Sequence, residues 1–396
     1  HDMSLAMRVT PYPVTAYGLA CGLGRDTAEV LARLRRGERG LSPVPLDVPF
    51  TTVTGTIPGE LPELDSRIAE HDSRLARVTQ LGFESIASEV ARAVSQWGPS
   101  RVACVLGTST GGIRATELAH AAHHHEGALP ASFDYRTQHP FHITTDICRK
   151  LGGFSGPAYI VSTACSSSGK VFASARRLLD AGLADAVLVG GADALCHTTV
   201  RGFFSLGVMA EGPCMPFSAD RPGMNIGEGA AFALIERSGT PRAMLLGVGE
   251  SSDAFHPSSP HPEGRGALAA MAHALEQAGL TAADVDYVNA HGTGTKHNDS
   301  AESQAVSTLL GREVPVVSTK GYTGHTLGAC GAVEAIFGIV SIEEGFLPAS
   351  VGSTPRDPEI TIHVPSERLE LQPRYVLSNS FAFGGNNCSV LLGRPA

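Results

Sequence analysis

The sequence predicts an α/β enzyme built from two halves of similar pattern. Short apolar runs bounded by glycine, such as residues 102–107 and 186–191, are typical of buried strands flanked by helices. With 396 residues the chain exceeds the usual size of a single core, so we expect two domains or two fused halves. A hydrophobic fraction of 42% with only 17% charged residues favours a tightly packed chain over a disordered one.

The first half also contains a predicted helix and a further strand. Apolar side chains recur at close to helical spacing from residue 166 to 181, and Gly182 follows where such a helix would end. Residues 158–161 precede this helix and have the composition of a strand. The alternation of short strands with a helix indicates an α/β arrangement.

A second unit begins near residue 242 and repeats this pattern. It contains a predicted strand, a predicted helix and another predicted strand, at residues 243–249, 266–278 and 285–290. No proline-rich linker separates the two units, so we expect them to pack as one body. We therefore divide the chain into residues 3–240 and 241–396, and exclude His1 and Asp2 as a cloning remnant.

The composition argues against nucleic acid and membranes as partners. A formal charge of −9 does not provide the basic surface that phosphate binding needs. No apolar run approaches the roughly 20 residues that cross a bilayer, so we expect a cytoplasmic protein. The eight cysteines are scattered without CxxC pairs, which predicts neither a disulfide framework nor a zinc site. The run from His123 to Glu126 is interpreted as a solvated loop, because adjacent residues rarely converge on one metal ion.

Cys165 is the candidate nucleophile. It lies between the predicted strand at 158–161 and the predicted helix at 166–181, on a strand-to-helix turn. The amides and macrodipole of a helix N-terminus stabilise an anion, so we expect a depressed pKa and a reactive thiolate at this cysteine. The sequence therefore predicts acyl transfer onto Cys165. The other seven cysteines are interpreted as small buried hydrophobes.

Three further glycine-rich loops supply polar groups after predicted strands. His291 stands in the run N-A-H-G-T-G-T, directly after a predicted strand. His325 ends the run S-T-K-G-Y-T-G-H, with Lys320 five residues earlier. Residues 378–387 include two adjacent glycines, which permit unusual backbone angles and a close approach of amides to a ligand. Together with Cys165, these loops provide the groups that acyl transfer requires.

At these loops the chain resembles the β-ketoacyl-ACP synthases of the KAS I/II group. The motifs T-A-C-S-S, H-G-T-G-T, K-x-x-x-G-H and N-S-F-x-F-G-G occur in the family's order and span nearly the whole chain. The resemblance implies the thiolase fold, in which two duplicated halves form a five-layered αβαβα body. It also implies a dimeric, decarboxylating acyltransferase of fatty-acid, polyketide or polyene biosynthesis.

The resemblance further implies a role for each residue that matches the catalytic motifs. Cys165 would accept the acyl chain, while its own amide and that of Phe383 would bind the thioester oxyanion. His291 and His325 would hydrogen-bond the malonyl carbonyl and stabilise the enolate that forms when carbon dioxide leaves. Ping-pong kinetics would follow from the covalent intermediate.

Other matching residues would support this chemistry. Lys320 and Glu302, the acidic residue with which the family lysine commonly pairs, would orient the two histidines. Two mobile segments would open the pocket to carrier-borne substrate. Their residues are Phe383, Gly384, Gly385, Asp253 and Phe255. Neither a bound cofactor nor a metal is implied, because both substrates arrive on the phosphopantetheine arm of acyl carrier protein.

Two departures from the fatty-acid enzymes bear on the pathway. The stretch 209–220 is compact, and Lys170 stands in the helix after the nucleophile, where it would face the pocket and favour conjugated chains. These features resemble the ketosynthases of aryl-polyene and related polyene clusters, which often pair with a Cys-lacking chain-length subunit. We expect either such a heterodimer or a homodimer.

Three alternatives stay open on the sequence alone. A chain-length or structural subunit would not use Cys165, although the His-His-Lys set argues against this role. A thiolase would share the fold, but Cys330 and Cys388 do not match the C-terminal cysteine loop of thiolases. A KAS III-type synthase would carry a Cys-His-Asn set, which the K-x-x-x-G-H motif does not fit.

A docking site for acidic carrier protein is predicted at Arg67, Arg74 and Arg77. These residues lie in a segment with helical character, where long-range attraction would steer an acidic partner. An ordinary solvated helix face explains the same charges equally well.

Overall fold

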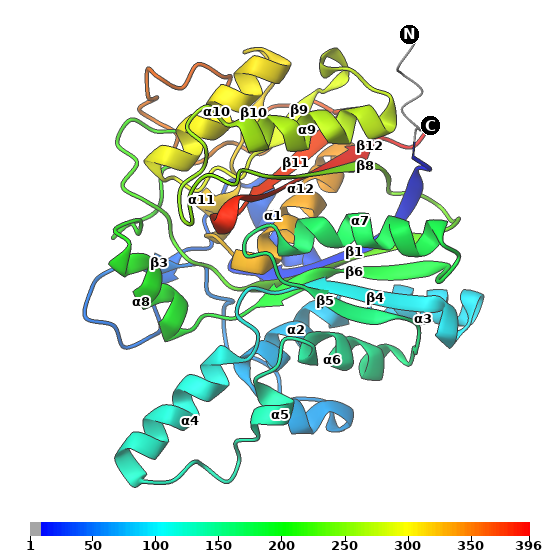
Figure 1. The fold of residues 1–396 in the computed structure, drawn as a ribbon, viewed down its shortest axis with the longest axis vertical. Helices are drawn as coiled ribbons and strands as arrows, with labels where there is room; N and C mark the ends of the chain where they lie inside the picture. Colours follow the sequence, from blue (N-terminus) through cyan, green and yellow to red (C-terminus); the bar gives the residue numbers. More distant parts are fainter. Residues whose placement is uncertain (1–8) are drawn as a thin grey trace.

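The computed structural model describes residues 9–396, so the expectation about His1 and Asp2 lies outside the described part of the chain. Figure 1 shows five stacked layers in which helices and strands alternate. Ten strands form one hydrogen-bonded sheet, which folds over on itself where β1 (Tyr12–Cys21) pairs with β8 (Ala243–Ser252). The predicted five-layered α/β architecture is confirmed.

The N-terminal half contributes five strands in the order β5-β4-β6-β7-β1. β4 pairs in parallel with β5 and β6, whereas β6, β7 and β1 pair antiparallel. Several of these strands are buried along their whole length, which is why the sequence shows continuous apolar runs instead of alternation. Besides β1, the strands are β4 (Val102–Gly107), β5 (Ala158–Val161), β6 (Ala186–Asp193) and β7 (Gly229–Glu236).

The C-terminal half repeats this topology in the order β10-β9-β11-β12-β8. β9 pairs in parallel with β10 and β11, whereas β11, β12 and β8 pair antiparallel. Besides β8, the strands are β9 (Tyr287–Asn289), β10 (Val316–Val317), β11 (Tyr375–Phe381) and β12 (Asn386–Gly393). The same strand order and the same parallel and antiparallel pairs confirm the duplication. The boundary at residue 240 stays a prediction.

Two helices form the central layer and contact strands of both halves: α7 (Ser167–Asp180) and α12 (Cys330–Glu344). Because α12 is enclosed on all sides, every residue from Cys330 to Ile342 is buried. In the outer layers, α2, α3 and α6 cover the N-terminal half of the sheet on its outer side, and α9 and α10 cover the C-terminal half on its outer side (Figure 1). The remaining longer helices are α1 (Thr27–Arg35), α2 (Arg74–Glu84), α3 (Ala87–Trp97), α4 (Ile113–Glu126), α6 (Ile143–Gly152), α8 (His197–Ser205), α9 (Arg265–Ala278) and α10 (Lys296–Leu310). Shorter elements are β2 (Ser42–Pro43), β3 (Val53–Thr54), α5 (Tyr135–Gln138) and α11 (Lys320–Thr323).

Most predicted elements lie within a few residues of their expected bounds. The strand predicted at 285–290 is shorter, because the chain leaves the sheet at Ala290 to form the loop of His291. The run from His123 to Glu126 is the last turn of α4 and not a loop, so that prediction is wrong. In the described residues, no helix has both the length and the apolar character that a membrane span requires.

Close packing of α7 against α12 predicts that Gly331→Ala destabilises the protein. An added Cβ at Gly331 would lie 2.5 Å from the backbone nitrogen of Gly169, so the helices would have to move apart. We expect a loss of about 1–3 kcal/mol in the free energy of unfolding, measured by urea denaturation. Gly202→Ala in α8 is the control, because nothing lies within 4 Å of its added Cβ, and it should be neutral or stabilising. Equal stability of both variants would contradict the close contact.

Candidate active site

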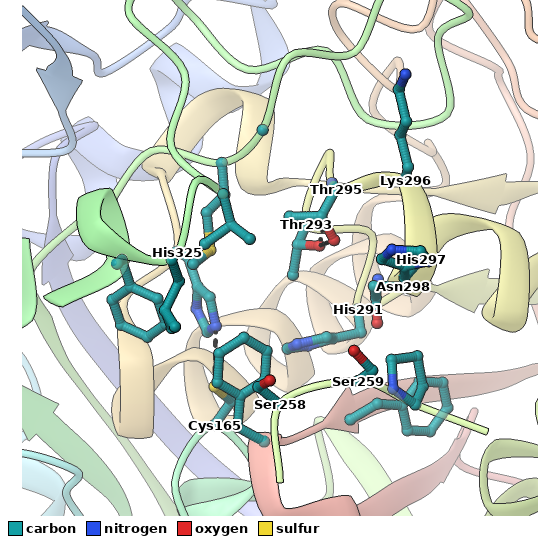
Figure 2. A pocket seen from close by; sticks show the side chains of 18 of the residues that line it. Cys165, Ser258, Ser259, His291, Thr293, Thr295, Lys296, His297, Asn298 and His325 are labelled. Atoms are coloured by element: carbon teal, nitrogen blue, oxygen red, sulfur yellow. Dashed lines mark hydrogen bonds between the residues drawn. The ribbon is translucent and has the colours of Figure 1, made fainter. Parts of the chain in front are cut away.

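Loops from both halves meet around a cavity of about 440 Å³. Cys165 from the N-terminal half lines it, together with His291, His325 and Phe383 from the C-terminal half. Figure 2 shows the two imidazole rings beside the sulfur of Cys165. The four loops that the sequence singled out are therefore brought to one place.

Cys165 lies on the turn that joins β5 to α7. The preceding residue, Ala164, has a left-handed backbone with φ of 51°, which is strained for a residue with a Cβ. Ser167 holds the turn, because its hydroxyl donates to the Ala164 carbonyl (2.5 Å) and accepts from the Thr163 amide (2.9 Å). The turn presents the thiol to the cavity, although the residue is only 6% exposed.

The depressed pKa expected for Cys165 is not found. Burial raises the pKa of this thiol to about 11, and the nearby charge of Lys320 and the amide of Phe383 offset only part of the effect. The helix N-terminus that motivated the expectation begins later, at Ser167. The resting cysteine is therefore a protonated thiol, whose thiolate has to be stabilised by its neighbours during the reaction.

His325 contacts the sulfur directly, with its Nε2 at 3.1 Å from Cys165 Sγ. Its Nδ1 accepts a hydrogen bond from the amide of Leu327 at 3.2 Å. In the neutral ring the proton is therefore on Nε2, which faces the sulfur. Burial and the charge of Lys320 lower the pKa of His325 well below 6.5. His325 is thus a neutral Nε2–H donor.

His291 has the same protonation for a different reason. Its Nδ1 lies 3.3 Å from Nζ of Lys320, which is a donor only, so the ring proton is again on Nε2. Burial, the charge of Lys320 and the neighbouring His325 lower the pKa of His291 well below 6.5. The two imidazole rings lie edge to face with centroids 5.2 Å apart. The cavity therefore contains two neutral N–H donors next to one thiol.

Lys320 pairs with Glu334 on α12 and not with Glu302, which corrects the predicted partner. Its Nζ lies 2.5 Å from Oε1 of Glu334, and both side chains are 1% exposed. Burial lowers the pKa of Lys320, but the attraction of Glu334 outweighs it and leaves the pKa raised. Glu302 instead accepts from the amides of His291 and Gly292, at 2.8 Å each. It fixes the backbone of the His291 loop.

Phe383 approaches the nucleophile with its backbone and lines the cavity with its side chain. Its backbone amide lowers the pKa of the Cys165 thiol. Its ring centroid lies 5.7 Å from that of Phe203 on α8. Gly384 and Gly385 follow with φ of 80° and 75°, a conformation that residues with a Cβ rarely adopt.

The two predicted gate segments contact each other. The carbonyl of Gly385 accepts from the amide of Asp253 (2.9 Å), and the amide of Gly384 donates to the carbonyl of Pro257 (2.7 Å). Asp253 also lines the cavity. Phe255 is 53% exposed, packs on a histidine of its own loop and lies outside the cavity lining, so it does not occupy the expected position at the pocket.

Several cavity residues were not singled out from the sequence. Thr293 and Thr295 follow His291 in the same loop, and their hydroxyls lie 2.9 Å apart (Figure 2). Their position directly after the histidine is a signal that was available in the H-G-T-G-T motif. Others include Phe203, Arg221, Ser258, Ser259, Lys296, His297 and Asn298.

The predicted docking arginines do not form one free basic patch. Arg74 bonds through two nitrogens to the buried carboxylate of Glu228, at 2.8 and 2.5 Å. Arg67 and Arg77 each pair with a nearby aspartate at the surface. Arg74 is therefore part of a structural ion pair, which corrects its expected role, whereas docking by Arg67 and Arg77 stays a prediction.

Lys170 does not face the cavity. Its Nζ lies 3.4 Å from Oδ1 of Asn386 and 4.0 Å from a carboxylate oxygen of Glu250. The residue is absent from the cavity lining. The expected contact of this lysine with a conjugated chain is not found.

The cavity contains a thiol and two imidazoles, which are side chains that can bind a transition metal, but the protonation of the two histidines disfavours metal binding. The sulfur of Cys165 and ring nitrogens of His291 and His325 lie within 4.8 Å of one another. A metal ion needs the lone pair of Nε2, and ligating histidines normally donate a proton from Nδ1. Here both Nδ1 atoms accept hydrogen bonds instead. These residues are arranged to donate to a substrate oxygen.

The buried side-chain oxygens that have no hydrogen-bond partner among the described residues include Asn289 Oδ1, Glu334 Oε2 and Ser378 Oγ. Asn289 and Ser378 are neighbours in the sheet, and the Asn289 amide donates to the Glu334 carbonyl at 3.4 Å. Such oxygens are normally satisfied by an ordered water or ion. This part of the site is therefore polar and not a dry core.

Comparison with known proteins identifies what the chain is similar to. The β-ketoacyl synthase N-terminal domain matches residues 13–240, and the β-ketoacyl synthase C-terminal domain matches residues 242–354. A nodulation protein E from Rhizobium sp. (strain N33) is 35% identical over 94% of this chain and 96% of its own length. A 3-oxoacyl-[acyl-carrier-protein] synthase 2 from Staphylococcus aureus is 31% identical over 96% of this chain and 99% of its own length.

A solved structure extends the similarity to three dimensions. The ketosynthase ApeO in complex with its chain length factor ApeC, from Xenorhabdus doucetiae, has a TM-score of 0.89 and 36% identity, and each chain covers 100% of the other. Together with the strand order, this similarity confirms the predicted thiolase fold.

Replacement of Arg74 by alanine should destabilise the protein more than the same replacement of Arg77. Arg74→Ala should lower the free energy of unfolding by about 3–5 kcal/mol, because it leaves the buried carboxylate of Glu228 unpaired. Arg77→Ala is the matched control and should change it by less than about 1 kcal/mol, because its pair with Asp72 lies at the surface. Urea denaturation at pH 7 measures both. Similar losses would speak against the buried ion pair.

Both active-site histidines should stay neutral as the pH is lowered. Their pKa values lie well below 6.5, so ¹⁵N shifts of labelled His291 and His325 should keep the Nε2–H pattern between pH 8 and pH 6. In the unfolded chain the same rings bind a proton below about pH 6.5, so their contribution to stability is present above that pH and decreases as the pH falls. The urea-unfolded chain is the reference. Titration of either ring near pH 6.5 in the folded protein would contradict this assignment.

Proposed function

The chain belongs to the β-ketoacyl synthase family, and on this premise we propose how its site performs a condensation. Family membership makes it a condensing acyltransferase that acts as a β-ketoacyl-[acyl carrier protein] synthase. One observation carries the mechanism: two neutral Nε2–H donors and the amide of Phe383 converge on the thiol of Cys165.

The first step transfers an acyl chain onto Cys165. The sulfur attacks the carbonyl carbon of an acyl thioester on phosphopantetheine, while the amides of Cys165 and Phe383 hold the oxyanion. The bond to the phosphopantetheine sulfur then breaks, and the leaving thiolate takes up the proton that Cys165 lost. Because burial raises the pKa of Cys165, the thiolate needs the support that Lys320 and the Phe383 amide give.

The second step forms the new carbon–carbon bond. His291 and His325 donate their Nε2–H groups to the thioester carbonyl of malonyl-ACP, and the bond to the carboxylate breaks with release of carbon dioxide. The electron pair remains on the α-carbon as an enolate, which attacks the acyl carbon on Cys165. The carbon–sulfur bond breaks, and a β-ketoacyl thioester leaves on the carrier. The sulfur of Cys165 departs as a thiolate and takes up a proton from water, which restores the resting thiol. Neutral donors suit this step, because a base is not required.

The residues behind the histidines have separate roles in this proposal. Lys320 donates to Nδ1 of His291 and so keeps the proton on Nε2. Glu334 holds the lysine in place and balances its charge. Glu302 anchors the loop that carries His291. All three are positioning residues, because none of them lines the cavity.

The other readings have less support. A thiolase uses a second cysteine in the pocket, whereas neither Cys330 nor Cys388 lines the cavity. A purely structural subunit would not need two histidines held in one tautomer by separate donors. We therefore retain the catalytic reading and keep the chain-length or structural subunit as the alternative.

We infer that the substrates are acyl and malonyl groups on acyl carrier protein, with no cofactor bound by the chain itself, and that the reaction takes place in the cytoplasm. The relative ApeO was solved in complex with its chain length factor, which supports a heterodimer with a chain-length partner. That the partner lacks the cysteine and that the product is a polyene rest on the resemblance of the sequence to the polyene-cluster ketosynthases. The edge strand β5 has partly exposed residues and pairs on one side only, with β4. A homodimer through such an edge is the alternative.

Intact-mass analysis tests this function. The purified chain is incubated with acyl carrier protein bearing saturated or polyunsaturated acyl groups, and we expect a covalent adduct on Cys165. Cys165→Ala should abolish the adduct and the condensation, whereas Cys104→Ala, which removes a buried cysteine distant from the cavity, should have no effect. His325→Ala should slow decarboxylation by about 10²–10³-fold but leave some self-acylation, because it removes one oxyanion donor.

Each outcome of this experiment is informative. Preference for the polyunsaturated chain would place the protein in polyene biosynthesis, and preference for the saturated chain in fatty-acid synthesis. No adduct with either chain, alone or with a chain-length partner, would favour the structural reading. Normal turnover by Cys165→Ala would overturn the site.

A further inference from the structure

A second thiol, Cys330, lies against the backbone of the nucleophile. It is the first residue of α12 and is 1% exposed. Its sulfur is 3.2 Å from the carbonyl oxygen of Cys165. The two cysteines pack with Ala164 and Ala382 in a small apolar cluster separate from the larger cores. The proposed mechanism does not use this thiol.

The thiol of Cys330 is the donor in this contact. Burial raises its pKa well above 9.0, so the sulfur keeps its proton, and a carbonyl oxygen only accepts. The amides at the start of α7 donate to the carbonyls of Ala164 and Ser166, at 3.1 Å. The carbonyl of Cys165 lies between these two and receives the Cys330 S–H instead.

We propose that Cys330 is a positioning residue that holds the turn of the nucleophile. The turn includes the left-handed Ala164, so contacts from outside are needed to keep it in one conformation. Fixing the carbonyl of Cys165 fixes its peptide plane and hence the direction in which its sulfur points. This proposal rests on the function proposed above, because that function makes Cys165 the nucleophile.

The position of Cys330 on α12 links the nucleophile to the histidines. Four residues later, and therefore on the same face of the helix, Glu334 pairs with Lys320, which donates to His291. Side-chain atoms of His291, Cys330 and Glu334 lie within 4.8 Å of one another. One fully buried turn of α12 thus supports the sulfur through Cys330 and the His291 N–H donor through Glu334 and Lys320. Their relative position is set by a single rigid element.

The test compares Cys330→Ala, which removes the donor, with Cys330→Ser, which keeps an O–H donor. The rate of alkylation of Cys165 by iodoacetamide is measured from pH 6 to pH 10 by peptide mass spectrometry, together with self-acylation by acyl carrier protein. Cys330→Ala should react roughly 3- to 10-fold more slowly, with an inflection at higher pH and an unchanged KM for the carrier. Cys330→Ser should stay within about twofold of the unaltered protein.

Controls separate positioning from general damage. Cys104→Ala removes another buried cysteine and should leave both rates unchanged. Thermal unfolding of every variant shows whether it is folded at the assay temperature, and the Ser variant remains a test if the Ala variant is not. Equal rates for the Ala variant and the unaltered protein, or equal slowing by Ala and Ser, would overturn the hydrogen-bonding role. Failure of the unaltered protein to acylate at Cys165 would instead refute the proposed function, because alkylation needs no substrate.

Discussion

The candidate site depends on one buried charge, the ammonium group of Lys320. It donates to His291, pairs with Glu334, supports the thiolate of Cys165 and lowers the pKa of both histidines. A fully buried ion pair contributes little net stability, because the desolvation of both charges offsets their attraction. The pair is therefore better explained by the chemistry, since a single cation lowers the pKa of three neighbouring side chains: Cys165, His291 and His325.

The positions of the reactive side chains were predictable because each follows a strand in a glycine-rich loop. Cys165, His291 and His325 all belong to such loops, and the repeated strand order of the two halves brings these loops around one cavity. Their protonation was not predictable. The helix-terminus argument for Cys165 considers only local backbone, whereas the raised pKa depends on how completely other segments exclude water from the sulfur.

Ion-pair partners that are distant in the sequence were also not predictable. Glu302 was matched from the family resemblance to the acidic residue that pairs with Lys320, but α12 brings Glu334 to the lysine instead. Arg74 was interpreted as a free surface charge, although its partner Glu228 is 154 residues away. No local pattern indicates such pairs, because they depend on how whole elements pack.

Because α7 lies between the two halves of the sheet, it cannot be fully covered until β8 to β12 exist. On the ribosome, the 213 residues from 181 to 393 have to be added between the end of α7 and the end of β12, which takes roughly 10–40 seconds at about 5–20 residues per second. During this interval the nascent chain exposes the apolar face of α7 that will later pack against the C-terminal strands. Nascent-chain chaperones and aggregation compete for that face until the C-terminal strands are available to cover it.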